Sequence, residues 1–222
     1  MTSAPAKAII HVVPTLHQYH AAAPGYGFDA LTRVLEELRP DVLVLELTER
    51  ALRERRPQVV KQEYQNSVFP YLERRGIPAV AMEPDEALWE DFVTHGLEAE
   101  QRFRQAWPER HAAYERGVRD TFTELLRNWD SPAAVNSARS DRVVEEKHAR
   151  ENDMFGEAYG DYWDRWNECF AQAIVRTAQA NPGKRLVALA GFEHGYWLRR
   201  RLHELEAAGA AWTLAPRLSG EI

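Results

Sequence analysis

Four short apolar runs divide the chain, and each is followed by polar residues. They occupy residues 8–13, 41–47, 77–82 and 186–190. The runs are continuous rather than alternating, which is typical of parallel strands covered by helices on both faces. Helical patterns separate the first three runs: 28–38, stopped by Pro40, and 51–75, with Pro57 near its start and Gly76 past its end. This alternation predicts an α/β fold with a mostly parallel central sheet and helices on both faces.

Residues 86–180 have a different character, because charged and aromatic residues recur there at helical spacing without a long apolar run. We expect three or four helices, forming an insertion over the strand ends of a single domain that covers residues 1–222. The turn 181–183 returns the chain to the fourth run, and 211–214 predicts a last edge strand. Helix packing explains the tryptophans of the insertion most simply, and a ring-binding pocket around 159–166 is the alternative.

Chemistry-bearing residues stand at or just after the ends of the four apolar runs. They are His17, Glu46, Glu83 and His194. Ligands of open parallel sheets bind beyond the carboxyl ends of the strands, so we expect a site there. Two imidazoles and a carboxylate leave an open position on a catalytic divalent metal ion. Without a metal, the same groups can act as a general base and an orienting acid. Both interpretations require the first and fourth strands to be near neighbours.

The remaining histidines and the cysteine carry weaker signals. His20 follows His17 by three residues and is a candidate ligand or substrate contact, whereas His11 lies inside a strand and is expected to be buried. We expect the other four histidines to be exposed on helices: His95, His111, His148 and His203. No standard zinc motif, phosphate-binding loop or nucleophile elbow is present. Cys169 lies in an amphipathic pattern and is expected to pack.

The composition narrows the classes of partner. A formal net charge of −6 leaves no basic excess for phosphates, so nucleic acid is not expected as the main partner. We expect a cytoplasmic protein without a membrane partner, because there is no leader-like start and no apolar run of about 18 residues. The single cysteine fits a reducing compartment. The aromatic insertion is compatible with a homodimer.

Four motifs resemble those of one protein family. They are Gly191–His194 and Pro14–His17, matching two G-x-x-H motifs, Pro40–Leu47 with the acid Glu46, and the helix pattern Asn167, Phe170, Ala171 and Ile174. In this set the chain resembles the TraB/Tiki group, which is similar to erythromycin esterase and ChaN-like proteins (the EreA/ChaN-like fold). Pro14 replaces a motif glycine, and Trp166 stands at the motif's arginine, with Arg165 one position away. Arg150, Asn152 and Met154 form a rival match for the helix pattern.

The resemblance implies a mixed sheet, helices on both faces, a helical insertion and a pocket at the strand ends. In the Tiki branch the paired histidines and a glutamate are associated with divalent-metal-dependent peptide cleavage. In the esterase branch a histidine is the general base without metal, and ChaN-like proteins bind haem iron. The shared pocket is therefore better supported than any one reaction.

Our leading hypothesis is a divalent-metal-dependent hydrolase acting on a small molecule or a peptide. His17, Glu46 and His194 would hold manganese, iron, cobalt or zinc, and Glu83 or Glu193 would be the base toward a bound water. The candidate residues that bind or polarise the substrate are Arg165 or Arg150 with Asn167, together with His20, Asn152 and Tyr196.

Three alternatives stay open at this point. The first drops the metal and makes His17 or His194 the general base for ester or lactone cleavage. The second is a non-enzymatic protein that binds haem or another metal complex, with Tyr19, Tyr196 and His20 as candidate ligands. The third is a helper protein or degenerate family member without chemistry of its own.

Overall fold

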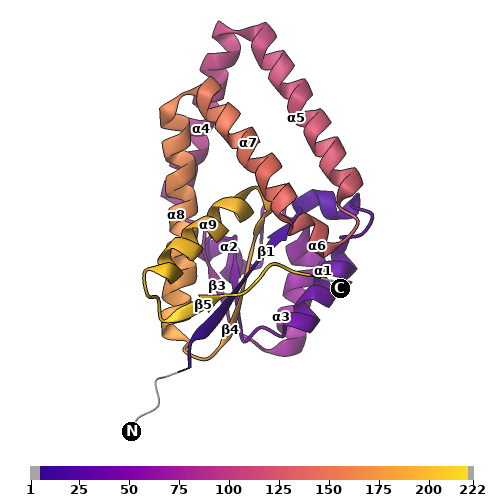
Figure 1. The fold of residues 1–222 in the computed structure, drawn as a ribbon, viewed down its shortest axis with the longest axis vertical. Coiled ribbons are helices and arrows are strands. Elements are labelled where there is room, and N and C mark those ends of the chain that lie inside the picture. The colour runs from indigo at the N-terminus through magenta and orange to yellow at the C-terminus, as the bar shows by residue number, and fades with distance from the viewer. Residues whose placement is uncertain (1–5, 220–222) are drawn as a thin grey trace.

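Five parallel strands form the central sheet of the computed structural model, which describes residues 6–219 (Figure 1). The strand order is β3-β2-β4-β1-β5. The strands are β1 (Ala8–Thr15), β2 (Val42–Leu45), β3 (Ala79–Ala81), β4 (Arg185–Gly191) and β5 (Trp212–Leu214). The predicted α/β class is confirmed, and every pairing in the sheet is parallel, so it is not the mixed sheet that the family resemblance implied.

The two strands that lead to the predicted histidines are neighbours. β1 and β4 pair along most of their length, from Ile9 opposite Arg185 to Thr15 opposite Gly191. All of β2 and the part of β4 after Arg185 are buried. The cause is visible in Figure 1: α8 (Glu157–Ala180) and α9 (Gly195–Ala207) lie on one side of the sheet, and α1 and α3 lie on the other.

The segment between β1 and β3 contains a predicted helix that is interrupted. Its elements are η1 (His17–Ala21), α1 (Phe28–Leu38), α2 (Glu49–Glu54), the π-helical turn η2 (Tyr64–Val68) and α3 (Phe69–Arg75). The helix predicted over 51–75 is wrong in its middle, because Arg55 adopts a left-handed conformation (φ 55°) and ends α2. Pro57 therefore lies in a loop rather than at a helix start. Gly76 ends α3 with φ 62°, as predicted.

The helical insertion rises beyond the carboxyl ends of the strands (Figure 1). Its helices are α4 (Glu86–Ala106), α5 (Pro108–Asn128), the short α6 (Pro132–Val135), α7 (Ala138–Phe155) and α8. It therefore holds one helix more than the upper number predicted. Across residues 6–219, no helix has both the length and the apolarity that crossing a membrane requires.

Pro14 lies inside β1, where a proline would ordinarily break a ladder of hydrogen bonds. The outer neighbour β5 pairs only with Ala8–Ile10, so this edge of β1 is open further along. Side chains satisfy its carbonyl groups there: Asn136 Nδ2 donates to Val12 O (3.1 Å), and the Tyr26 hydroxyl donates to Pro14 O (2.9 Å). Pro14 faces the same open edge as Val12, so its missing N–H costs no pairing with β4.

Candidate active site at the strand ends

The chain leaves β1 and β4 in opposite directions, although the two strands are adjacent. β1 leads to β2, across β4, and β4 leads to β5, across β1. Such a switch point opens a crevice beyond the carboxyl ends of the two strands. His17 follows β1, and the short η3 (Phe192–His194) follows β4 at this crevice.

A buried carboxylate connects the two histidines. Glu46 follows β2 and is 3 % exposed. Its Oε1 lies 3.6 Å from His17 Nε2 and 3.8 Å from His194 Nε2, and its Oε2 accepts a hydrogen bond from Gly191 N–H. Three predicted site residues, each following a different strand, therefore meet at one atom, Oε1 of Glu46.

Gly191 makes this close approach possible. A Cβ atom at this position would lie 2.7 Å from His17 Nε2 and 3.3 Å from Glu46 Oε2. Any other residue would push the imidazole and the carboxylate away from the end of β4.

His17 is a cation between two carboxylates. Its Nδ1 lies 2.8 Å from Glu63 Oε1, and its Nε2 faces Glu46. Burial by itself would lower the pKa of His17, but Glu46 and Glu63 raise this pKa to about 10. The ring is therefore an imidazolium at neutral pH.

His194 is neutral, and its tautomer follows from its partner. Its Nδ1 lies 2.9 Å from Asn167 Oδ1, while Asn167 Nδ2 donates to Trp163 O (2.8 Å), which orients the amide. An amide oxygen only accepts, so Nδ1 of His194 carries the proton and Nε2 keeps its lone pair. Burial lowers the pKa of His194 to about 4. The indole of Trp163 stacks on the ring, with centroids 4.6 Å apart.

Lys61 is an ammonium beneath the site that the sequence patterns did not reveal. Its Nζ lies 3.0 Å from Glu46 Oε1 and 2.6 Å from Glu83 Oε1, and it donates to Glu46 O (2.8 Å). Burial would raise the pKa of Glu46, but Lys61 and the two histidines hold this pKa well below its usual value. Glu83, a predicted base, is thus engaged by Lys61, and burial raises its pKa.

Glu193, the other predicted base, is also engaged. Its Oε2 lies 3.1 Å from Lys147 Nζ and 3.5 Å from His148 Nε2, two residues of α7. Lys147, and then His148, hold the pKa of Glu193 low against the effect of burial. His148 is buried and stacks on Trp163 at 4.1 Å, so its predicted exposure is wrong.

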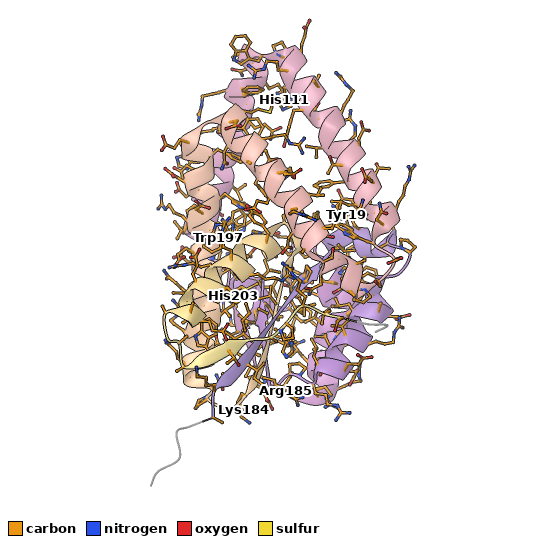
Figure 2. The ribbon with its side chains drawn as sticks, viewed as in Figure 1. Tyr19, His111, Lys184, Arg185, Trp197 and His203 are labelled. Atoms are coloured by element: carbon orange, nitrogen blue, oxygen red, sulfur yellow. The ribbon has the colours of Figure 1, made fainter. Side chains whose placement is uncertain are left out.

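His111 is buried as well, 2.8 Å from Glu100 Oε1. It lies near the tip of the insertion, far from Tyr19 at the site, as Figure 2 shows. The pattern along each helix predicted that these two histidines are exposed. They are buried because a neighbouring helix covers each of them.

Of the remaining predicted site residues, two are held in structural hydrogen bonds and three lie outside the strand-end site. Both ring nitrogens of His20 are occupied, by Leu16 N–H (2.9 Å) and by Tyr26 O (2.6 Å). The Tyr196 hydroxyl accepts from Trp163 Nε1 (3.1 Å). Three polar residues lie outside the strand-end site: Arg165 is exposed beside Phe92 and Tyr162, Asn152 is exposed on α7, and Arg150 lines a groove between α5 and α7.

A cleft of about 300 Å³ opens onto these groups. Its lining includes His17, Tyr19, Phe122, Trp163, Glu193 and His194. Trp163 is thus both a helix-packing residue and a wall of the cleft. Aromatic walls and a few convergent polar groups are typical of a small-molecule site.

The donor set does not fit a metal centre. A nitrogen-and-oxygen set of this kind would suit a divalent ion, but Lys61 already places a positive charge 3.0 Å from the shared oxygen of Glu46. Within residues 6–219, no group of three or more His, Cys, Asp or Glu side chains is arranged to hold a metal ion.

Comparison with known proteins yields no relative: no family model matches the chain, and neither a curated protein nor a solved structure does. The case for a function accordingly depends on the geometry of the site.

Proposed function

We propose that this protein is a hydrolase of carboxylic esters or lactones, with His194 as a metal-independent general base. The observation that carries this proposal is the Asn167–His194 hydrogen bond (2.9 Å), which leaves a lone pair on Nε2 of a histidine that lines the cleft. A fixed tautomer with a free lone pair on a cleft wall is what general-base catalysis by histidine requires.

In the proposed reaction, Nε2 of His194 takes a proton from a water molecule as the water oxygen attacks the ester carbonyl carbon. The tetrahedral intermediate then breaks its bond to the leaving oxygen, which receives the proton from His194. Glu46, 3.8 Å from Nε2, stabilises the positive charge that the ring gains in the first step.

His17 supplies the complementary charge. Its imidazolium lines the same cleft, and its Nε2 is 3.6 Å from Glu46, which is too long for a strong hydrogen bond. The Nε2–H group makes no strong hydrogen bond to Glu46 and, in the proposed reaction, donates to the oxyanion that develops on the substrate.

The test is hydrolysis of p-nitrophenyl acetate and of a simple lactone by the wild-type protein and by His194→Gln. We expect the variant to lose at least about 100-fold in kcat, because the base is removed while the ring's volume is largely kept. The matched control is His203→Gln, an exposed histidine of α9. Full turnover in His194→Gln would overturn the proposal.

Elemental analysis and dialysis against a chelator separate the proposal from the metal-dependent alternative. We expect wild-type turnover to survive the chelator. A near-stoichiometric divalent ion, lost together with activity in the chelator and in His194→Gln, would instead support the metal-dependent hydrolase.

A further inference from the structure

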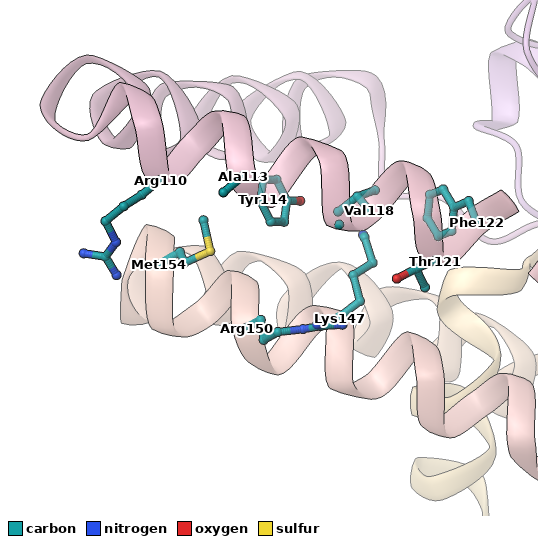
Figure 3. A pocket seen from close by; sticks show the side chains of 10 residues that line it. Arg110, Ala113, Tyr114, Val118, Thr121, Phe122, Lys147, Arg150 and Met154 are labelled. Carbon is teal, nitrogen blue, oxygen red and sulfur yellow. The ribbon is translucent and has the colours of Figure 1, made fainter. Parts of the chain in front are cut away.

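A second cavity of about 300 Å³ runs between α5 and α7 (Figure 3), beside the cleft. Phe122 lines both cavities. Lys147 lines the groove, and its ion pair with Glu193 (3.1 Å) reaches a wall of the cleft. The two cavities are therefore neighbours, with Phe122 and the Lys147–Glu193 pair at their border.

The wall of the groove is suited to an apolar chain. Figure 3 shows Phe122 at one end and Arg110 at the other, with Val118, Ala113 and Met154 among the residues between them. Twelve residues of helix separate Phe122 from Arg110, which corresponds to about 18 Å. The groove is long enough for an extended substrate.

A peptide would fit this groove poorly. Its walls are helices, whose main-chain groups are bonded within each helix. Two polar side chains of the lining are engaged, since the Tyr114 hydroxyl donates to Glu151, and Lys147 Nζ lies 3.0 Å from Glu151 Oε1. The remaining ones, Arg110, Arg150 and Thr121, are too few to pair the main-chain groups of a buried peptide, whereas a hydrocarbon chain needs no partners.

Two arginines provide positive charge along the groove. Arg150 donates from Nε to Glu146 O (3.2 Å), which leaves its Nη groups for a ligand. Arg110 extends over the rings of Phe103 and Trp107, at the end away from the cleft. Guanidinium groups in such positions favour a carboxylate or another anionic group.

Gly117 widens the groove at its middle. A Cβ atom here would have no neighbour within 4 Å, so the glycine is not needed for packing or for backbone conformation. A glycine inside a helix lowers helix stability, and its clearest consequence here is space beside Val118 and Thr121.

We propose that the groove between α5 and α7 binds the acyl part of the substrate, an elongated apolar chain that carries an anionic group at its distal end. This inference rests on the proposed hydrolase function, because it places the scissile ester in the cleft beside His194. The substrate class is then an ester with a long, distally anionic acyl chain, which the cleft alone does not specify.

Three esters test the proposal: p-nitrophenyl acetate, p-nitrophenyl decanoate and the mono-p-nitrophenyl ester of sebacic acid. We expect kcat/KM to rise from acetate to decanoate and again to the sebacate ester. Gly117→Trp, which fills the groove, should lower kcat/KM for the two long esters at least about tenfold and leave acetate within about twofold. Gly117→Ala is the matched control and should behave as the wild type.

The arginines are tested by Arg110→Gln together with Arg150→Gln, with Arg116→Gln, exposed on α5, as the control. The double variant should lower kcat/KM for the sebacate ester about tenfold and leave the decanoate ester unchanged. Equal losses on all three esters, or no preference for the charged chain in the wild type, would overturn the inference.

Binding separates this inference from the hydrolase proposal. Calorimetric titration of His194→Gln with monomethyl sebacate measures occupancy of the groove without turnover. Binding that Gly117→Trp abolishes supports the groove even if hydrolysis fails, whereas binding unaffected by that substitution overturns it.

Discussion

The amide oxygen of Asn167 lies 2.9 Å from Nδ1 of His194, two residues that are 27 positions apart in the chain. The same amide donates to Trp163 O one turn earlier on α8, so neither end of the amide is free to rotate. Because the ring is also stacked on Trp163, its position and its tautomer are set together. Asn167 is therefore a positioning residue for the proposed base.

Replacing Asn167 by Asp places a negative charge against Nδ1 of His194. This charge favours the imidazolium, so the pKa of His194 should rise by about 1–2 units from about 4. The acidic limb of the kcat/KM profile should move to higher pH by the same amount, which is measured with p-nitrophenyl acetate. Asn152→Asp, on the exposed face of α7, is the control and should leave the limb in place. An unchanged limb in Asn167→Asp would remove Asn167 from the mechanism.

Stability should pass through a maximum near pH 6.5, where both histidines titrate in the unfolded chain. Between pH 4 and 6.5 the unfolded state binds more protons, because the pKa of His194 is lowered by folding to about 4, and stability rises with pH. Between pH 6.5 and 10 the folded state binds more, because the pKa of His17 is raised to about 10, and stability falls.

Each slope should reach at most about 1.4 kcal/mol per pH unit from its histidine. Urea unfolding measured across this range checks both limbs. His17→Gln should flatten the alkaline limb, and His194→Gln the acidic limb. If His17→Gln leaves the alkaline slope unchanged, the imidazolium assignment is wrong.

Alanine should have opposite effects at two glycines. Gly191→Ala brings a methyl group within 2.7 Å of His17 Nε2 at a buried strand end, so it should destabilise the protein by about 1–3 kcal/mol. Gly117→Ala meets nothing within 4 Å and lies inside α5, so it should stabilise by about 0.5–1 kcal/mol. Urea unfolding of the two variants side by side tests the difference. Equal stabilities would contradict the crowding at the end of β4.

Lys61→Met removes the cation shared by Glu46 and Glu83. Breaking a buried ion pair on one side typically costs about 3–5 kcal/mol, because a carboxylate stays buried without a partner. We expect a loss of this size at neutral pH and a partial recovery in Lys61→Met combined with Glu83→Gln. Lys184→Met is the control, because this exposed lysine lies 4.0 Å from Asp41 and should have little effect. A loss below about 1 kcal/mol in Lys61→Met would show that the pair is solvated.

Local features of the sequence determined the strands, two of the helix ends and the polar residues that follow the strands. The four apolar runs predicted β1 to β4, the segment 211–214 predicted β5, and Pro40 and Gly76 predicted two helix ends. Strand burial and chain reversal leave such local patterns in the sequence. His17, Glu46 and His194 were found the same way, as polar residues after buried strands.

Tertiary structure alone decided which residues meet. The pairing of β4 with β1 depends on a long crossover through the helical insertion, so no local pattern contains it. The left-handed Arg55 that divides the predicted helix gave no signal either, because this conformation usually marks a glycine.

The buried charged residues show most clearly why the sequence does not reveal which residues meet. Lys61 and Glu63 are 3 % and 0 % exposed, yet both come from the segment 51–75, for which the sequence pattern predicted only a helix. A buried lysine is stable only when carboxylates from other parts of the chain reach it, as Glu46 and Glu83 reach Lys61, and those carboxylates are stable only with the lysine. Such mutual burial depends on contacts between distant parts of the chain. The sequence by itself therefore determined which residues follow the strands, and only the tertiary structure decided which charged groups are buried together at the site.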